Sequence, residues 1–400
     1  MPTSFVHYLL AFVLILANAR ATPNFEIEYS GNIELQAQEL KNPKSARDLG
    51  ADWEREEAYI GYANVDAKVL LWKNLVDINW FVRHSASDLY KDDNAAVSYF
   101  NFPNNVILRN VFKLQRVEET DTGVTESTLN EFFYEWGDEE TSFTFGRMFI
   151  DYGKGFVFNP IDPFMLPLSF SSLQGVQQGN DGLKFLFDSE SDLRLHLYLL
   201  GDKQFHGGDE RITRTIFLRG DWDYSRELHI NYVLGEDQKR HKYGLELAHD
   251  FGSGLLFGQA MRHSQRLDKQ DSDADGLFHY IVGYEKDLTR NLTSRLEFGK
   301  RDRDEEYPEP AYQQEFAPFS NFLALNSTYN FNPGHQIILQ GLLDAKTRFS
   351  YMKVAYAFKL SKSLSSRMFA QGVTSRPSDE EDLGQKRVPS AAGIALAGSF

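Results

Sequence analysis

An acidic stretch in the second half of the chain has a spacing that could bind a metal ion. Asp271, Asp273 and Asp275 stand at alternate positions before Gly276, as in the first half of a calcium loop. The position that should supply the bidentate glutamate is Val282, so the motif is only half present. Calcium is the one cofactor that the sequence suggests, and a plain acidic surface loop is the alternative.

Catalytic residue types occur without a catalytic arrangement. His263 and Ser264 are adjacent, and neighbours in a strand point to opposite faces, so they cannot act together as base and nucleophile. Gly153-Lys154-Gly155 lacks the spacing of a phosphate-binding loop, and no G-x-S-x-G or H-E-x-x-H motif is present. The chain has no cysteine, which excludes disulfides and thiolate chemistry. We expect a protein that is not an enzyme.

The elements that carry these residues are predicted to be strands. Segments of about ten residues alternate between apolar and polar side chains and are separated by turn residues, which is typical of membrane barrels. Residues 193–199 and 352–360 are clear examples. Each polar face contains charges, so a soluble sheet would need one very large common core, whereas the apolar faces of a barrel meet lipid.

The amino terminus has the pattern of a secretory signal peptide. An apolar run at residues 8–17 is followed by Ala19-Arg20-Ala21, so we expect residues 1–21 to be removed. No later window contains 18 consecutive apolar residues. Any membrane-spanning part must therefore be a barrel, and we expect residues 22–400 to form one barrel domain.

The last strand, Ser390 to Phe400, supports the same interpretation. Ile394, Leu396 and Phe400 share one parity, and small residues occupy the other. This ending resembles the carboxy-terminal strand of bacterial outer-membrane barrels, in which the final Phe is read by the assembly machinery. Aromatic residues make up 14% of the chain, which suits the aromatic girdles of such barrels.

Connection lengths predict the topology. Counted back from the carboxy terminus, short and mostly longer connections alternate, as short periplasmic turns and longer outer loops do. The sequence predicts an all-β, antiparallel, up-and-down transmembrane barrel of about 18–20 strands, with 16 as the alternative. Both termini are expected in the periplasm.

Strand parity also predicts which residues line the lumen. Bases and acids both occur on the face opposite the lipid-facing side chains. The net charge of −15 lies largely in the loops and argues against a nucleic-acid partner. The main candidates for the lumen wall are Arg109, Arg194, Arg211, Arg219, Lys242, Glu246, Arg295 and Glu297.

The segment at residues 151–179 departs from the strand pattern. Its prolines and glycines exclude a regular strand or helix through its middle. A long apolar loop outside the cell would favour aggregation, whereas a loop folded into the lumen would bury its apolar residues and narrow the pore. Four polar residues are expected at this constriction: Asp151, Lys154, Asn159 and Asp162.

This region resembles a known family. Phe145-Gly146-Arg147, Tyr152-Gly-Lys-Gly155 and Asn159-Pro-Ile-Asp162 are similar to a segment of porin-like outer-membrane proteins, including those grouped around alginate export. The resemblance implies a diffusion or export channel with an in-folded loop. A strongly basic lumen is expected for alginate export, and the lumen candidates here carry both signs, so the resemblance does not identify the solute.

Arg147 presents a conflict of parity. It shares the face of Phe143, Phe145 and Phe149, which a lipid-facing strand surface would not tolerate. Either a bulge turns Arg147 inward, or these aromatic residues face the pore.

The sequence therefore predicts a porin-like channel in the outer membrane of a Gram-negative bacterium. It would pass or export a small polar or charged solute passively, narrowed by the 151–179 loop. The alternatives are a structural or adhesive barrel with a plugged lumen and acidic outer loops, and, less favoured, an outer-membrane hydrolase. The expected partners are the lipid bilayer, lipopolysaccharide, the barrel assembly machinery and the solute.

Overall fold

The computed structural model describes the strands and most short turns of the chain. The described residues are 25–41, 55–71, 74–87, 115–120, 123–138, 140–150, 153–157, 159–161, 179–189, 192–206, 209–237, 240–264, 276–302, 320–344, 349–375 and 390–399. The expected signal peptide and Phe400 lie outside these ranges, so the domain boundaries stay a prediction. Within the described ranges, no helix has the length and apolar character needed to cross a bilayer.

Nineteen strands occur in the described ranges, and they form a single antiparallel sheet. They are β1 (Phe25–Lys41), β2 (Arg55–Leu71), β3 (Asn74–Ser87), β4 (Gln115–Thr120), β5 (Gly123–Gly137), β6 (Thr141–Met148), β7 (Asn180–Asp188), β8 (Leu193–His206), β9 (Asp209–Asp223), β10 (Leu228–Asp237), β11 (Arg240–Asp250), β12 (Gly254–His263), β13 (Phe278–Thr289), β14 (Leu292–Lys300), β15 (Asn321–Asn332), β16 (His335–Asp344), β17 (Phe349–Lys359), β18 (Leu364–Ser375) and β19 (Ser390–Ser399).

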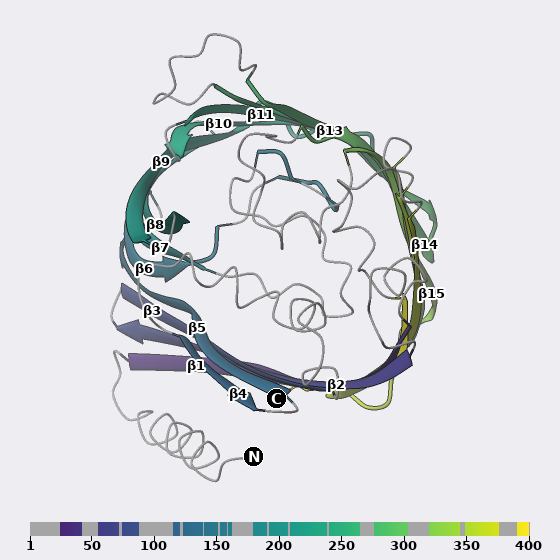
Figure 1. The fold of residues 1–400 in the computed structure, drawn as a ribbon. Coiled ribbons are helices and arrows are strands. Elements are labelled where there is room, and N and C mark those ends of the chain that lie inside the picture. Colours follow the sequence, from purple (N-terminus) through teal and green to yellow (C-terminus); the bar gives the residue numbers. More distant parts are fainter. Residues whose placement is uncertain are drawn as a thin grey trace.

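The sheet closes on itself because β1 pairs with both β2 and β19. The short β4 pairs only with β5, among the described residues, whereas β3 pairs with β5 directly. The closed ring therefore contains eighteen of the described strands, with β4 as an arm on β5. Figure 1 shows the strands arranged as this ring. The prediction of an antiparallel barrel of 18–20 strands is confirmed.

The connections are short at the end of the barrel where β1 begins and β19 ends. Each of these turns has two to four residues: 72–73, 138–140, 189–192, 224–227, 251–253, 290–291, 333–334 and 360–363. Side chains stabilise several of them, as when Asp138 Oδ1 accepts the Thr141 N–H at 2.8 Å. The short connections predicted at this end are confirmed for these turns, but at the opposite end the β8–β9 and β10–β11 connections, which were expected to be longer, also have two residues each. The turn expected at residues 103–105 lies outside the described residues.

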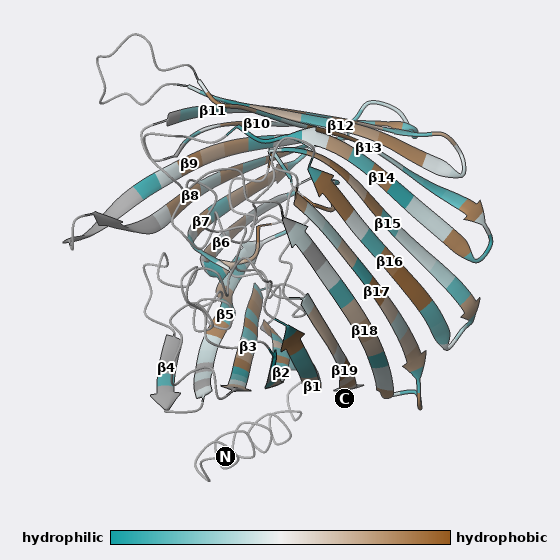
Figure 2. Ribbon diagram, turned by 45° about the vertical axis from the view of Figure 1, so that its right-hand side comes forward, coloured by the Kyte–Doolittle hydropathy of each residue, from teal (hydrophilic) through white to brown (hydrophobic). Residues whose placement is uncertain are grey.

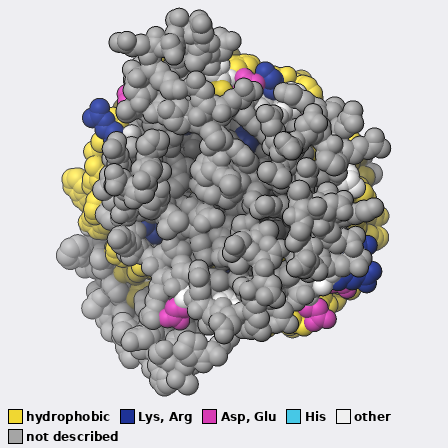
Figure 3. Space-filling model, viewed as in Figure 1, with side chains coloured by type: hydrophobic (Ala, Val, Ile, Leu, Met, Phe, Trp, Pro, Cys, Tyr) yellow, Lys and Arg dark blue, Asp and Glu magenta, His cyan; other side chains and the backbone are white. Residues whose placement is uncertain are grey.

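The two faces of the wall differ as the parity predicts. On β19, Ile394 and Leu396 are 50% and 42% exposed, whereas Ala391 and Ala395 on the opposite face are 5% and 2% exposed. Apolar residues recur along the strands in Figure 2, and hydrophobic side chains edge the wall in Figure 3. Exposed aromatic side chains border the short turns, as expected for a girdle at a membrane interface: Trp136, Phe187, Trp222, Tyr224, Phe251 and Phe331.

The closing seam is joined by a side-chain network inside the barrel. The lumen face of β19 carries small residues such as Ala395, and Arg367 of β18 reaches across this strand to β1. Its Nη2 donates to Glu34 Oε1 at 3.0 Å, and Glu34 Oε2 accepts the Tyr62 hydroxyl of β2 at 2.7 Å. These contacts thus link β18, β1 and β2 across β19, at the point where the ring closes.

Arg367→Met should weaken this seam. Glu34 would keep only the Tyr62 hydroxyl among these partners, and losing a hydrogen bond to a mostly buried charged group costs about 1–3 kcal/mol of unfolding free energy. The measurement is the temperature at which the purified barrel loses its compact mobility in gel electrophoresis.

Arg194→Met is the matched control, because the Arg194 side chain is 59% exposed in its ion pair with Asp188 and exposed pairs contribute about 0–1 kcal/mol. Equal losses of stability in the two variants would contradict a special role for the seam.

Candidate functional site

Two buried carboxylates on the lumen wall form the centre of the candidate site. Glu246 of β11 is 0% exposed and Glu297 of β14 is 1% exposed. Their strand neighbours Leu245, Leu296 and Phe298 are 45%, 49% and 48% exposed on the lipid-facing side. Alternation therefore sends both carboxylates inward, as the sequence predicted for these two residues.

Both carboxylates bind the backbone of the loop that follows β6. Glu297 accepts the Phe156 N–H at Oε1 (2.6 Å) and the Val157 N–H at Oε2 (3.0 Å). Glu246 Oε2 accepts the Lys154 N–H at 2.9 Å. This part of the expected in-folded loop therefore lies against the inner wall of the barrel, opposite the strands from which the loop departs.

Amide side chains complete the contact. Gln259 of β12 donates through Nε2 to Glu246 Oε2 (2.6 Å) and to Asn159 Oδ1 of the loop (3.2 Å). Asn231 of β10 donates to Glu246 Oε1 at 2.6 Å, and the Gly155 N–H donates to Asn159 Oδ1. We call Glu246, Gln259 and Glu297 the wall clasp. Donors surround its carboxylates, as buried charged groups require.

Apolar contacts accompany the clasp. Val157 is fully buried in a cluster with Ile281, Phe322, Phe349 and other lumen-facing residues. On the other side, Ile161 packs in a second cluster that includes Met148, Tyr198, Leu200, Phe217, Val233 and Met261. Burying these loop residues removes apolar surface from water and favours the inward position of the loop.

Two cations lie on the same strands as the clasp carboxylates, Lys242 on β11 and Arg295 on β14. The Arg295 Nε atom is 2.8 Å from Glu297 Oε1, and its guanidinium lies over the Phe257 ring at 4.8 Å from the centroid. Lys242 Nζ lies 5.8 Å from the centroid of the Phe217 ring. Aromatic faces attract cations in this arrangement. The lumen wall is thus mixed in charge around the loop.

The other predicted wall residues are spread along the barrel. Arg219 Nε is 2.5 Å from Asp221 Oδ1, and His196 Nε2 is 3.2 Å from Asp221 Oδ2, which joins β8 and β9. Arg194 pairs with Asp188 near a short turn. Arg211 belongs to β9, but its side chain lies outside the described residues, as does the whole of Arg109.

Several expected site residues cannot be placed. Asp151 and Asp162 of the loop, and Asp271, Asp273 and Asp275 of the acidic stretch, lie outside the described residues. In the part of the chain that the structure describes, no group of three or more acidic or histidine residues could hold a metal ion. Calcium binding by the acidic loop stays a prediction.

The conflict at Arg147 has a local backbone cause. Gly146 has a φ of 133°, which interrupts the regular strand, although the register with β7 continues through Arg147. Phe145 remains 50% exposed on the outer face, whereas Arg147 is fully buried. The alternative in which this aromatic residue faces the pore is therefore wrong.

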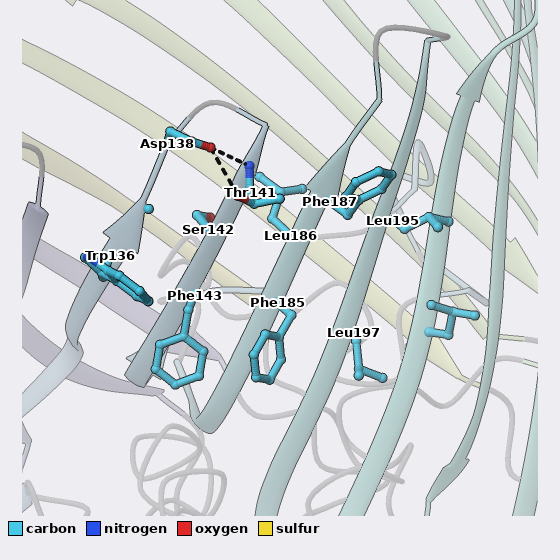
Figure 4. A pocket seen from close by; sticks show the side chains of 12 residues that line it. Trp136, Asp138, Thr141, Ser142, Phe143, Phe185, Leu186, Phe187, Leu195 and Leu197 are labelled. Atoms are coloured by element: carbon cyan, nitrogen blue, oxygen red, sulfur yellow. Dashed lines mark hydrogen bonds between the residues drawn. The ribbon is translucent and has the colours of Figure 1, made fainter.

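A cavity of about 710 Å³ lies outside the lumen, at the short-turn end of β5–β9. Figure 4 shows Phe143, Phe185 and Leu197 projecting from three neighbouring strands at this place, with Trp136 at its edge. These side chains have the lipid-facing parity. The cavity therefore belongs to the outer wall and is separate from the wall clasp.

Solved structures with the same architecture identify the fold. The chain aligns with Acinetobacter baumannii OccAB4 with a TM-score of 0.58 and 10% identity, covering 95% of this chain and 100% of that one. It aligns with Pseudomonas aeruginosa OccK8 (OprE) with a TM-score of 0.57 and 12% identity, covering 94% and 98%. It aligns with P. aeruginosa OccK2 (OpdF), solved in complex with glucuronate, with a TM-score of 0.58 and 10% identity, covering 94% of this chain and 96% of that one.

The chain has the fold of an outer-membrane porin. No family model matches the sequence, and no curated protein matches it. The finer resemblance to alginate-export proteins stays a prediction. The likeness to porins concerns the whole described barrel, whereas the sequence resemblance rested on one segment around residues 145–162.

Sequence reasoning missed three of the residues that complete this porin fold around the loop. In the sequence, Gln259 and Asn231 are distinguished only by being polar at positions whose side chains face the lumen. Asp181, which pairs with Arg147, stands at a position whose side chain would be expected to face lipid. Gln259 could have been found as an isolated amide between Phe257 and Met261 on the inward face of β12.

Glu297→Gln should loosen the loop at the clasp. A glutamine offers a single acceptor oxygen, so one of the two loop N–H groups loses its partner, at a cost of about 1–2 kcal/mol. We expect hydrogen–deuterium exchange at the Phe156 and Val157 amides to accelerate about tenfold, since 1.4 kcal/mol corresponds to a factor of ten.

Glu285→Gln is the control, because Glu285 contacts Arg295 at 3.2 Å but no loop amide among the described residues. Exchange that is unchanged in Glu297→Gln would contradict the hydrogen bonds assigned to the clasp.

Proposed function

We propose that this protein is a porin-like channel of the outer membrane that passes a small polar or charged solute and is narrowed by the 151–179 loop. The observation that carries the proposal is the wall clasp: loop residues Lys154, Phe156 and Val157 bind Glu246 and Glu297 inside the ring. A segment held there takes space from the pore.

The size of the barrel supports a channel. Barrels of 16–18 strands leave an aqueous lumen, whereas barrels of about 8 strands are filled by their own side chains. In the ring of eighteen described strands, an in-folded loop restricts the lumen without needing to fill it. Rings of charge select solutes only at a constriction, so the loop is where selection would occur.

The solute class follows from the wall. Arg295 pairs with Glu297, and Lys242 stands on the same strand as Glu246. A mixed wall suits polar solutes that offer both acceptors and donors. One structural neighbour was solved with glucuronate, which makes a small sugar acid the first solute to test. Outer-membrane localisation, with lipid, lipopolysaccharide and the assembly machinery as partners, belongs to the same proposal.

Purified protein in planar bilayers tests the channel. We expect discrete ion conductance from the unmodified barrel and a clearly larger conductance from the Glu246→Gln/Glu297→Gln double variant, because a loosened loop widens the narrowest part of the pore. Glucuronate should reduce the ionic current while it occupies the lumen.

Glu285→Gln serves again as the control and should conduct like the unmodified protein. Absence of conductance from both the unmodified barrel and a variant that lacks residues 157–161 would contradict the channel and favour a plugged, structural barrel.

A further inference from the structure

One edge of β5 is shared by two strands, β4 and β6, which leave an interval between them in the described part of the chain. β4 pairs with β5 as far as Gln115 opposite Thr128, and β6 begins its pairing at Arg147 opposite Phe132. Among the described residues, 129–131 of β5 pair with neither strand. A gap of this kind in a membrane barrel leaves backbone groups without partners, which is costly in lipid.

The gap coincides with a bulge in β5. On the other edge, Asn79 of β3 stands opposite Glu131 and Trp80 stands opposite Leu129, so Asn130 is an extra residue. Such an extra residue is left out of the ladder and redirects the neighbouring groups. Here the carbonyl groups of both Leu129 and Asn130 accept hydrogen bonds from partners outside the β4 and β6 ladders.

Arg147 supplies one of these partners. Its Nη1 donates to Leu129 O at 2.9 Å, while Nε and Nη2 bind the two carboxylate oxygens of Asp181 at 2.7 and 3.2 Å. The two side chains are 0% and 2% exposed. The planar guanidinium is the side chain that can make this fork with a carboxylate and still reach a carbonyl group.

The two ends of the long loop are attached at the same place. The Phe149 N–H, at the start, donates to Glu131 Oε1 at 3.1 Å, and the Gly179 N–H, at the end, donates to Asn130 O at 3.1 Å. Arg147 stands two residues before the first attachment, and Asp181 two residues after the second. The ion pair thus ties the departing strand β6 to the returning strand β7 directly beneath the loop.

We infer that Arg147 is the positioning residue of the loop, acting with Asp181 to hold both loop ends on the β5 bulge so that the loop enters the lumen. Without this pair the two loop ends would lose their attachments to Glu131 and Asn130 of β5, and the loop would no longer be directed toward the wall clasp on the other side of the barrel. This inference rests on the proposed function, because it explains how the narrowing element is placed.

Gly179 fits the same account. A Cβ atom at this position would lie 2.2 Å from Asn130 O and 2.7 Å from Arg147 Cγ. The first of these contacts is with backbone and cannot be relieved by a side-chain rotation. Only glycine allows the chain to pass this close to both the bulge and the Arg147 side chain.

The test is hydrogen–deuterium exchange on three variants of the whole barrel in lipid. Arg147→Leu/Asp181→Leu removes both charges together, so no unpaired charge remains buried, and the β6–β7 ladder is retained. Arg147→Lys keeps the charge but not the fork. Gly179→Ala keeps both charged side chains and places a methyl group against Asn130 O and Arg147 Cγ.

We expect exchange at the Phe149 and Gly179 amides to rise at least tenfold in the leucine double variant and in Gly179→Ala, and less in Arg147→Lys. Exchange in β8–β19 should stay as in the unmodified barrel. Arg367→Met is the matched control, because it weakens the closing seam and should leave the two loop-end amides unchanged. Asp181→Asn replaces the double variant if that protein does not assemble.

Unchanged exchange at Phe149 and Gly179 in an assembled double variant would overturn the inference, as would equal acceleration in Arg367→Met. Exchange reports the loop ends whether or not the barrel conducts. A barrel that fails to conduct but shows the expected acceleration would therefore reject the proposed function while keeping the role of Arg147.

Discussion

Every backbone N–H and C=O group of a chain that crosses a bilayer needs a partner within the protein. The described strands meet this requirement by closing into a ring, with β19 hydrogen-bonded to β1 over ten residues. The same requirement explains the hydrogen bonds at the irregular part of the ring. Where the described parts of β4 and β6 leave an interval on β5, Arg147 and Gly179 donate hydrogen bonds to the carbonyl groups of Leu129 and Asn130. The long loop begins and ends at the same place. The hydrogen bonds that complete the wall there therefore also hold the two ends of the loop.

The loop itself balances apolar burial against buried charge. Val157 and Ile161 gain from leaving water, whereas Glu246 and Glu297 are carboxylates held away from solvent, which is unfavourable unless they are hydrogen-bonded. Backbone N–H groups of the loop and the amides of Gln259 and Asn231 provide those bonds. The wall buries apolar side chains of the loop, and the loop donates hydrogen bonds to buried carboxylates of the wall. An apolar segment can therefore lie inside a polar lumen.

The sequence could predict what depends on period and spacing. Alternation placed Glu246, Glu297, Lys242 and Arg295 on the inner face, and turn residues located the short connections, because both follow from local geometry. It could not predict that Glu297 meets Phe156, since that contact joins residues 141 positions apart. The Arg147 conflict was visible, but its resolution involves both the positive φ of Gly146 and the bulge at Asn130, and the bulge depends on the pairing of β3 with β5, which is not a local feature.

The central claim is that the in-folded loop lines the path of the solute, and Lys154 offers the most direct measurement. Its side chain is exposed while its backbone is bound to Glu246, and the chain has no cysteine, so Lys154→Cys creates a single reactive site. Current through single barrels should fall in one step when a bulky charged thiol reagent is added, and recover on reduction. A current that is unchanged after complete modification of the cysteine would contradict the account.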